Sequence, residues 1–144
     1  MISNLTQMKT NELTGLILDC AFETHTELGP GLYESVYETC LEYEFQENGL
    51  LYHRQKPINI SYRGKMLDAG FRADFMVEDK VIVEIKAVET LSNLHLSQML
   101  TYLKLTNREI GLLINFNVQS LRFGIKRVLN KYYTGESDII HGFR

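Results

Sequence analysis

The chain is poor in several residue types that mark particular classes of protein. Its 144 residues include no tryptophan, two prolines and two cysteines. Cys20 and Cys40 are too few for a disulfide framework and lack the spacing of metal ligands, so we expect both to be reduced thiols. No window approaches the roughly 18 consecutive apolar residues of a membrane-spanning helix. The first eight residues also lack the basic stretch and apolar core of a secretory signal. We therefore expect a cytoplasmic protein with no membrane partner.

An excess of bases is also missing, because the formal net charge is −3. The charge is unevenly distributed: residues 1–50 carry one base and nine acids, and the remaining 94 residues carry fourteen bases and nine acids. A polyanion is expected to approach the second part and to be repelled by most of the first. Acidic helices that are merely solvated explain the same pattern equally well. With 44% hydrophobic residues, the length fits a single domain over residues 1–144, with a core of about 11–130 and an irregular tail at 134–144.

Helical spacing of apolar residues opens the chain. One stripe begins at Leu13 and ends at Leu28, with Thr10 or Asn11 as the candidate cap and Gly29-Pro30-Gly31 as the end. A second helix is predicted from about residue 32 to 47, ended by Asn48-Gly49.

The pattern then changes to strands. Strands are predicted at residues 57–62, 66–77, 81–87 and 110–116, with a helix at 93–106 capped by Ser92. The last strand of this set is apolar throughout, as in a strand covered on both faces. Residues 120–133 are mixed and end in a short helix or strand. The order predicts an α/β fold with one mixed sheet (α+β type) and helices packed on it.

Two carboxylates fall on neighbouring strands of this prediction. If Val77 pairs with Val81, Asp74 lies directly opposite Glu84, and Lys86 shares the face of Glu84. The same register puts one apolar set on the other face, consisting of Phe71, Ala73, Phe75 and Val77 opposite Val81, Val83, Ile85 and Ala87. Opposed carboxylates are destabilising unless something compensates for them, and a hard divalent cation such as Mg²⁺ does so. A solvated charged face, or a simple ion cluster with the lysine, is the alternative.

Asp74 followed by Glu84-Ile85-Lys86 resembles the signature of the PD-(D/E)XK nuclease superfamily. Residues 31–37, Gly-Leu-Tyr-Glu-Ser-Val-Tyr, also resemble the GxxExxY motif, after which a bacterial and archaeal family within that superfamily is named. The resemblance covers about residues 11–130 and implies an αβββαβ core, here preceded by an extra N-terminal helix. Ala73 stands where the superfamily's name has proline, a position that takes no part in the chemistry.

The resemblance also implies a metal-dependent nuclease. Asp74, Glu84 and the backbone carbonyl of Ile85 would bind Mg²⁺ or Mn²⁺, and Lys86 would orient or help to deprotonate the attacking water. Glu34, the acid of the GxxExxY match, would complete the metal site. Gln98 and Tyr102 resemble a QxxxY motif and would position the lysine, the metal or a phosphate. From spacing alone, a packed tyrosine and a solvated glutamine are the simpler interpretation.

The substrate is expected to be nucleic acid, with DNA preferred. Residues 120–133 contain no acid, and their bases are candidate phosphate contacts together with Arg72: Arg122, Lys126, Arg127 and Lys131. A solvated amphipathic segment explains this stretch equally well. Because cleavage of two strands often uses two subunits, a homodimer is a further candidate. A nucleic-acid-binding or adaptor module that keeps the fold and cleaves nothing is the alternative function.

Overall fold

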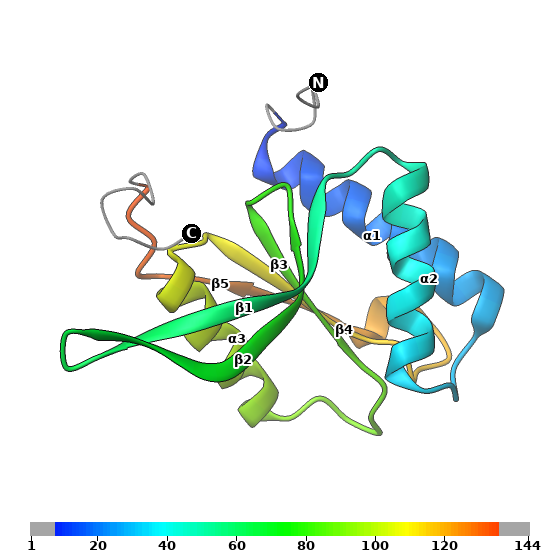
Figure 1. Ribbon diagram of the computed structural model, residues 1–144. Helices are drawn as coiled ribbons and strands as arrows, with labels where there is room; N and C mark the ends of the chain where they lie inside the picture. Colours follow the sequence, from blue (N-terminus) through cyan, green and yellow to red (C-terminus); the bar gives the residue numbers. More distant parts are fainter. Residues whose placement is uncertain (1–7, 136–144) are drawn as a thin grey trace.

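The computed structural model describes residues 8–135 and contains three helices, five strands and one 3₁₀ turn (Figure 1). The elements are α1 (Thr10–Leu28), α2 (Glu34–Glu47), β1 (Tyr52–Tyr62), β2 (Lys65–Val77), β3 (Val81–Lys86), α3 (Asn93–Thr106), β4 (Ile110–Asn115), the 3₁₀ turn η2 (Leu121–Gly124) and β5 (Ile125–Leu129). The predicted αβββαβ core and the extra N-terminal helix are confirmed. The irregular tail predicted at residues 134–144 lies outside the described residues, apart from residues 134 and 135.

The strands form one mixed sheet in the order β1-β2-β3-β4-β5. Strands β3 and β4 are parallel, and the other neighbours are antiparallel. A parallel pair requires a crossover connection, which α3 supplies. All six residues of β4 are buried, as expected for a strand covered on both faces. Within residues 8–135, no helix is long and apolar enough to cross a membrane.

Helices cover both faces of the sheet. Leu13 of α1 and Tyr37 of α2 belong to one core cluster with Val83 of β3, whereas Met99 of α3 packs in a second cluster with Ile82. Successive residues of a strand point to opposite faces, so α1 and α2 lie on one face and α3 lies on the other (Figure 1).

The termini of the helices follow the sequence in part. Ser92 accepts a hydrogen bond from the backbone N–H of His95 and so caps α3 as predicted, and Asn107 ends it in the left-handed conformation. The predicted cap of α1 at Thr10 or Asn11 is wrong. Its N-cap is Lys9, which makes no capping hydrogen bond through its side chain.

Both cysteines are free, and burial raises the pKa of the Cys20 thiol to about 12.

The predicted register between β2 and β3 is confirmed, since Val77 pairs with Val81 and Phe75 pairs with Val83. The expected face of Phe71 and Ala73 is wrong. Ala73 is fully buried in the cluster on the α3 face, with Phe71 packed against it, while Phe75 belongs to the cluster on the opposite face. The alternation of β2 breaks between Ala73 and Phe75. Gln55, at the corresponding position of the neighbouring strand β1, has φ of 55°.

Strands β1 and β2 extend well past the rest of the sheet. Their pairing runs from Tyr52 opposite Val77 to Tyr62 opposite Lys65, with an irregularity after Ile58, whereas the ladder between β2 and β3 covers only Phe75–Val77. The outer part of this hairpin projects from the body of the protein (Figure 1). The point at which β2 separates from β3 lies immediately before Phe75, and the candidate site is there.

Candidate active site and metal centre

Asp74 and Glu84 are joined by two reciprocal hydrogen bonds at the place where β2 and β3 separate. The backbone N–H of Asp74 donates to Oε1 of Glu84 at 2.8 Å, and the backbone N–H of Ile85 donates to Oδ2 of Asp74 at 2.8 Å. Each carboxylate thus takes the place of a backbone carbonyl that a continued ladder would have supplied. The arrangement fixes both side chains and turns them toward the gap between the strands.

Both carboxyl groups are harder to ionise than usual. Burial is the largest cause of the raised pKa of Glu84, which is about 8, and the nearby charge of Asp74 adds to it. Burial also raises the pKa of Asp74, and the charge of Glu38 contributes in the same direction. The backbone hydrogen bonds and the Lys86 ammonium act in the opposite direction on both groups. Ionisation of both carboxyl groups is therefore opposed first by burial and then by the neighbouring acids.

Lys86 and Ile85 complete the segment on β3. Lys86 is half-buried two residues after Glu84, so the two side chains share a face of the strand. None of the ion pairs of the described residues includes Lys86, Asp74 or Glu84. The N–H of Ile85 points toward the gap beside β2, and in a strand the carbonyl of the same residue points to the same side. The Ile85 carbonyl therefore faces the same gap.

Glu38 of α2 is a site residue that sequence reasoning missed. Its carboxylate is almost fully buried and accepts hydrogen bonds from Nε of Arg54 at 2.7 Å and from Nε2 of Gln55 at 3.0 Å. The same Gln55 amide donates to Oδ1 of Asp74 at 3.1 Å and so bridges the two acids. The signal available in the sequence was its helical spacing, because Glu38 lies one turn after Glu34 on the same face of the helix.

Glu34 lies near the site but makes a different contact from the one expected. It is exposed in the first turn of α2, and its Oε2 accepts a hydrogen bond from the backbone N–H of Ala87 at 3.3 Å. Glu34 thus ties α2 to the end of β3, one residue beyond Lys86. The charge that acts on Asp74 and Glu84 from this helix is that of Glu38.

The residues predicted on α3 are placed on the same side of the sheet as Glu84. Tyr102 is buried, and its pKa is raised by burial and by the charges of Glu84 and Asp74. Gln98 is exposed one turn earlier and, with Tyr102 and Phe71, lines a pocket of about 340 Å³. The tyrosine ring also lies 5.9 Å from the ring of Phe71. The charges of the two carboxylates thus influence Tyr102, while Gln98 lines a neighbouring pocket.

A model of the PD-(D/E)XK nuclease superfamily matches residues 11–128 of the chain. The chain belongs to the PD-(D/E)XK nuclease superfamily. No curated protein and no solved structure gives a significant match in the corresponding comparisons. The matched region includes the carboxylate pair, Lys86, α2 and α3. Membership implies a metal-dependent, nuclease-like function.

The carboxylate pair of this PD-(D/E)XK protein fits a hard divalent cation. Among residues 8–135, no group of three or more His, Cys, Asp or Glu side chains is arranged to hold a metal ion. Mg²⁺ is commonly held by one or two carboxylates and keeps several of its waters, so a closed protein cage is not required. The buried carboxyl of Glu84, the half-buried carboxyl of Asp74 and a carbonyl facing the same gap provide suitable oxygen ligands, and a cation would compensate for the charge of both carboxylates once they are ionised.

The predicted phosphate contacts do not form one surface. Lys126 and Arg127 are consecutive residues of β5 and point to opposite faces of the sheet. Arg127 donates to Oγ1 of Thr14 in α1 at 3.0 Å and so lies on the α1 face. Lys126 is in register with Leu113 of β4, which is in register with Glu84 of β3, so Lys126 lies on the α3 face with Glu84. Arg122 and Lys131 are exposed beside aromatic rings, at Phe123 and Tyr132 respectively. Arg72 is exposed on β2, two residues before Asp74.

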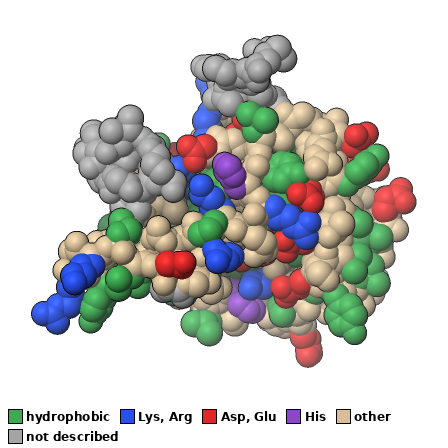
Figure 2. All heavy atoms as spheres, viewed as in Figure 1, with side chains coloured by type: hydrophobic (Ala, Val, Ile, Leu, Met, Phe, Trp, Pro, Cys, Tyr) green, Lys and Arg blue, Asp and Glu red, His purple; other side chains and the backbone are tan. Residues whose placement is uncertain are grey.

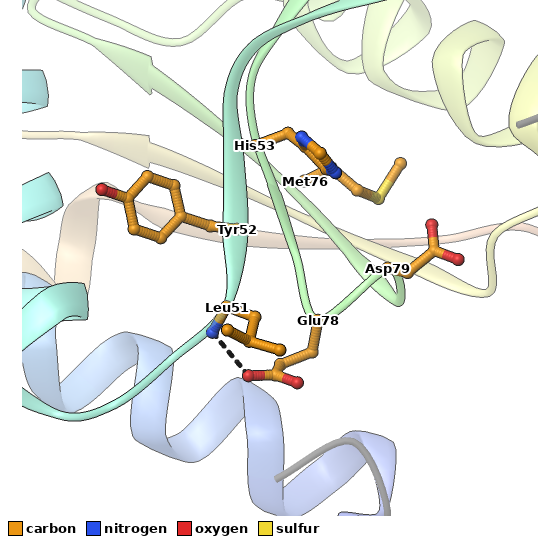
Figure 3. Close-up of a pocket in the computed structure, with 6 residues that line it drawn as sticks. All are labelled: Leu51, Tyr52, His53, Met76, Glu78 and Asp79. Carbon is orange, nitrogen blue, oxygen red and sulfur yellow. Dashed lines mark hydrogen bonds between the residues drawn. The ribbon is translucent and has the colours of Figure 1, made fainter. Parts of the chain in front are cut away.

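A second pocket, of about 380 Å³, lies beside the β2–β3 turn and shares no lining residue with this site. It is lined by Leu51, Tyr52, His53, Met76, Glu78 and Asp79 (Figure 3). Oε2 of Glu78 accepts a hydrogen bond from the backbone N–H of Leu51 at 2.6 Å, which attaches the β2–β3 turn to the start of β1. Two consecutive non-glycine residues of this turn, Glu78 and Asp79, have positive φ, as a tight hairpin turn requires. We interpret this region as structural.

Proposed function

We propose that this protein is a Mg²⁺- or Mn²⁺-dependent nuclease that hydrolyses phosphodiester bonds, with DNA as the substrate. The observation that carries the proposal is the reciprocal pairing of Asp74 and Glu84. A buried and a half-buried carboxylate are held in this way, with a lysine two residues after Glu84 on the same strand. The pair suits phosphoryl chemistry better than it suits stability, because like charges directly opposed in a sheet are destabilising.

Each residue has a proposed part. Asp74, Glu84 and the carbonyl of Ile85 would hold the cation, which when bound supplies polarisation of the phosphate and a water of lowered pKa. The Lys86 ammonium donates hydrogen bonds, so it would orient the attacking water and stabilise charge that develops on the phosphate oxygens. Glu38 and Gln55 would hold Asp74 in place from the α2 side.

The residues farther from the pair have positioning parts. The Tyr102 hydroxyl would donate a hydrogen bond toward Glu84 or a phosphate oxygen, and Gln98 would contact substrate at the adjoining pocket. Glu34, which holds the end of β3 through Ala87, would bind a water of the metal. Lys126, Arg72, Arg122, Arg127 and Lys131 are proposed phosphate contacts, of which Lys126 and Arg72 are the better placed.

Three broader assignments belong to the same proposal. The Gly31–Tyr37 segment supports membership in the bacterial and archaeal GxxExxY family, with α2 beginning at the glutamate of the motif. A cytoplasmic location and a homodimer are proposed on the grounds given by the sequence. A non-cleaving nucleic-acid-binding module on the same fold is the outcome that would replace the nuclease.

The proposal is tested by metal binding and cleavage in parallel. We expect wild-type protein to bind Mn²⁺ in calorimetry and to cleave labelled DNA with Mg²⁺ or Mn²⁺. Asp74→Ala and Glu84→Ala should each lose most of the Mn²⁺ binding and lower cleavage by a factor of about 100 or more. Glu109→Ala removes an exposed acid from another part of the surface and is the matched control. Unchanged Mn²⁺ binding in both site variants would contradict the metal assignment, and metal-dependent DNA binding without cleavage would favour the non-cleaving module.

A further inference from the structure

The outer part of the β1–β2 hairpin is not explained by the core or by the carboxylate site. Beyond Ile58 it is a two-stranded ribbon, paired from Asn59 opposite Asp68 to Tyr62 opposite Lys65. Large apolar side chains are exposed near its end, with Tyr62 at 60%, Met66 at 48% and Leu67 at 42%. An isolated two-stranded ribbon is marginally stable in water, so an arm of this kind is expected to have a partner.

The charge of the hairpin is opposite to that of the whole chain. Residues 56–72 contain four bases and one acid, although the net charge of the protein is −3. The acid, Asp68, accepts a hydrogen bond from the backbone N–H of Gly70 at 2.9 Å. None of the four bases, which are Lys56, Arg63, Lys65 and Arg72, takes part in an ion pair of the described residues. Figure 2 shows Lys and Arg side chains beside hydrophobic ones at the far end of the hairpin. The surface therefore suits a polyanion.

The hairpin also begins at the candidate site. Arg72 precedes Asp74 by two residues, so the bases of β2 continue outward from the carboxylate pair toward the turn. At about 3.3 Å per residue, the stretch from Asp74 to Lys65 reaches roughly 25–30 Å. That length corresponds to about eight nucleotides along a duplex at about 3.4 Å per step. A duplex whose phosphate lay at the carboxylates would pass beside the hairpin.

We propose that the outer β1–β2 hairpin is an arm that lies in the major groove of duplex DNA beside the phosphate to be cleaved. The inference rests on the proposed nuclease function and extends it to a double-stranded substrate. The major groove of B-form DNA, about 12 Å wide, admits a two-stranded ribbon, whereas the narrow, deep major groove of A-form RNA does not. Arg63 and Lys65 at the tip contact phosphates, and the apolar side chains next to them contact the groove wall.

The test measures binding apart from cleavage, by fluorescence anisotropy in EDTA. The probes are duplex DNAs of about 8 and about 24 base pairs, a duplex RNA and a single-stranded DNA of about 24 residues, chosen against the reach of the arm. Arg63→Gln combined with Lys65→Gln should weaken binding of the long duplex DNA about tenfold and lower its logarithmic salt slope by about two. The same variant should change binding of the short duplex less than twofold.

The control removes an exposed lysine beside α1, on the acidic side of the molecule, with Lys9→Gln, and should leave the affinity for long duplex DNA within twofold. Arg63 has φ of 52°, so if the double variant fails to fold, Lys65→Gln alone should give about half of the change in salt slope. Unchanged binding of long duplex DNA, or an equal loss on duplex RNA or single strands, would overturn the arm. So would unchanged DNA binding with a lower sedimenting mass, because the hairpin would then pair with a second copy. If the hairpin variant loses DNA binding but the wild-type protein cleaves nothing in Mg²⁺ or Mn²⁺, the proposed nuclease function is wrong and the arm is supported. If the wild-type protein cleaves DNA but the hairpin variant binds it normally, the arm is wrong and the nuclease function is supported.

Discussion

The carboxyl group of Glu84 links the proposed chemistry to the stability of the fold. Its pKa is raised from an ordinary value of 4.5 to about 8, first by burial and then by the charge of Asp74. Between these two values the folded chain keeps a proton that the unfolded chain releases. Stability without metal should therefore fall as the pH rises through this window, and divalent ions should bind more tightly as the same proton leaves.

Replacing this carboxyl by an amide should remove that pH dependence. Glu84→Gln keeps an oxygen that accepts from the N–H of Asp74 and cannot acquire the buried charge. We expect the variant to match wild type near pH 5 and to exceed it near pH 8 by about 1–3 kcal/mol in free energy of unfolding, the usual cost of an inadequately paired buried polar group. Urea titrations in EDTA at both pH values measure this difference. Glu109→Gln is the control on an exposed acid, and an unchanged pH slope in Glu84→Gln would contradict the explanation.

Lys86 should be needed for cleavage and not for folding or metal binding. An ammonium cannot bind a cation, and Lys86 is in no ion pair of the described residues. Lys86→Met keeps the apolar stem and should lower the rate of cleavage by about two to four orders of magnitude, the scale of one acid–base or electrostatic group. Calorimetry should show Mn²⁺ affinity equal to or slightly above that of wild type. Normal activity per folded molecule would make Lys86 only a counter-ion of the carboxylates.

At the scale of elements, apolar periodicity was sufficient to predict the pairing and burial of strands that are regular. The period-two pattern predicted the pairing of Val77 with Val81, and the continuous apolar run predicted β4 as a buried strand. The face of Ala73 could not be predicted, because the alternation of β2 breaks between Ala73 and Phe75, and nothing in the apolar pattern marks that break. The role of Glu38 was hidden for a similar reason. Its partners, Arg54 and Gln55, lie on β1, and part of that strand was not predicted.

Substitution by alanine should change the free energy of unfolding in opposite directions at two glycines, one in a strand and one in a helix. A Cβ at Gly111 of β4 would lie 2.3 Å from Sδ of Met99, whereas a Cβ at Gly15 of α1 would meet no atom within 4 Å. Gly111→Ala would displace the buried side chain of Met99 and should cost about 1–3 kcal/mol, the usual range for overpacking. Gly15→Ala removes backbone freedom from a helix interior and should add about 0.5–1 kcal/mol. Urea denaturation measures both, and destabilisation of equal size in the two variants would contradict this account.

The whole molecule presents two electrically different sides. The nine acids of residues 1–50 belong to the segment that forms α1 and α2 on one face of the sheet. The opposite face carries α3, the inner hairpin and the side of β3 on which Glu84 lies. A polyanion is repelled from the first side, so nucleic acid should approach from the second, over α3 and along the hairpin. The charge imbalance in the sequence predicted that two parts of the protein would differ in charge. The alternation of side chains across the sheet determines which residues lie on each side.

The two bases at the centre of β5 provide a test of this separation. Lys126 lies on the face of Glu84, two strands away through Leu113, while Arg127 lies on the acidic face and donates to Thr14. Lys126→Gln should weaken DNA binding severalfold and lower the salt slope by about one, with little effect on stability. Arg127→Gln should leave the salt slope unchanged and reduce the free energy of unfolding by about 0.5–1.5 kcal/mol, the value of one hydrogen bond. Each variant removes one charge from the same strand, so each is the control for the other. If both lowered the salt slope equally, nucleic acid would contact both faces, and the proposed approach over α3 would be wrong.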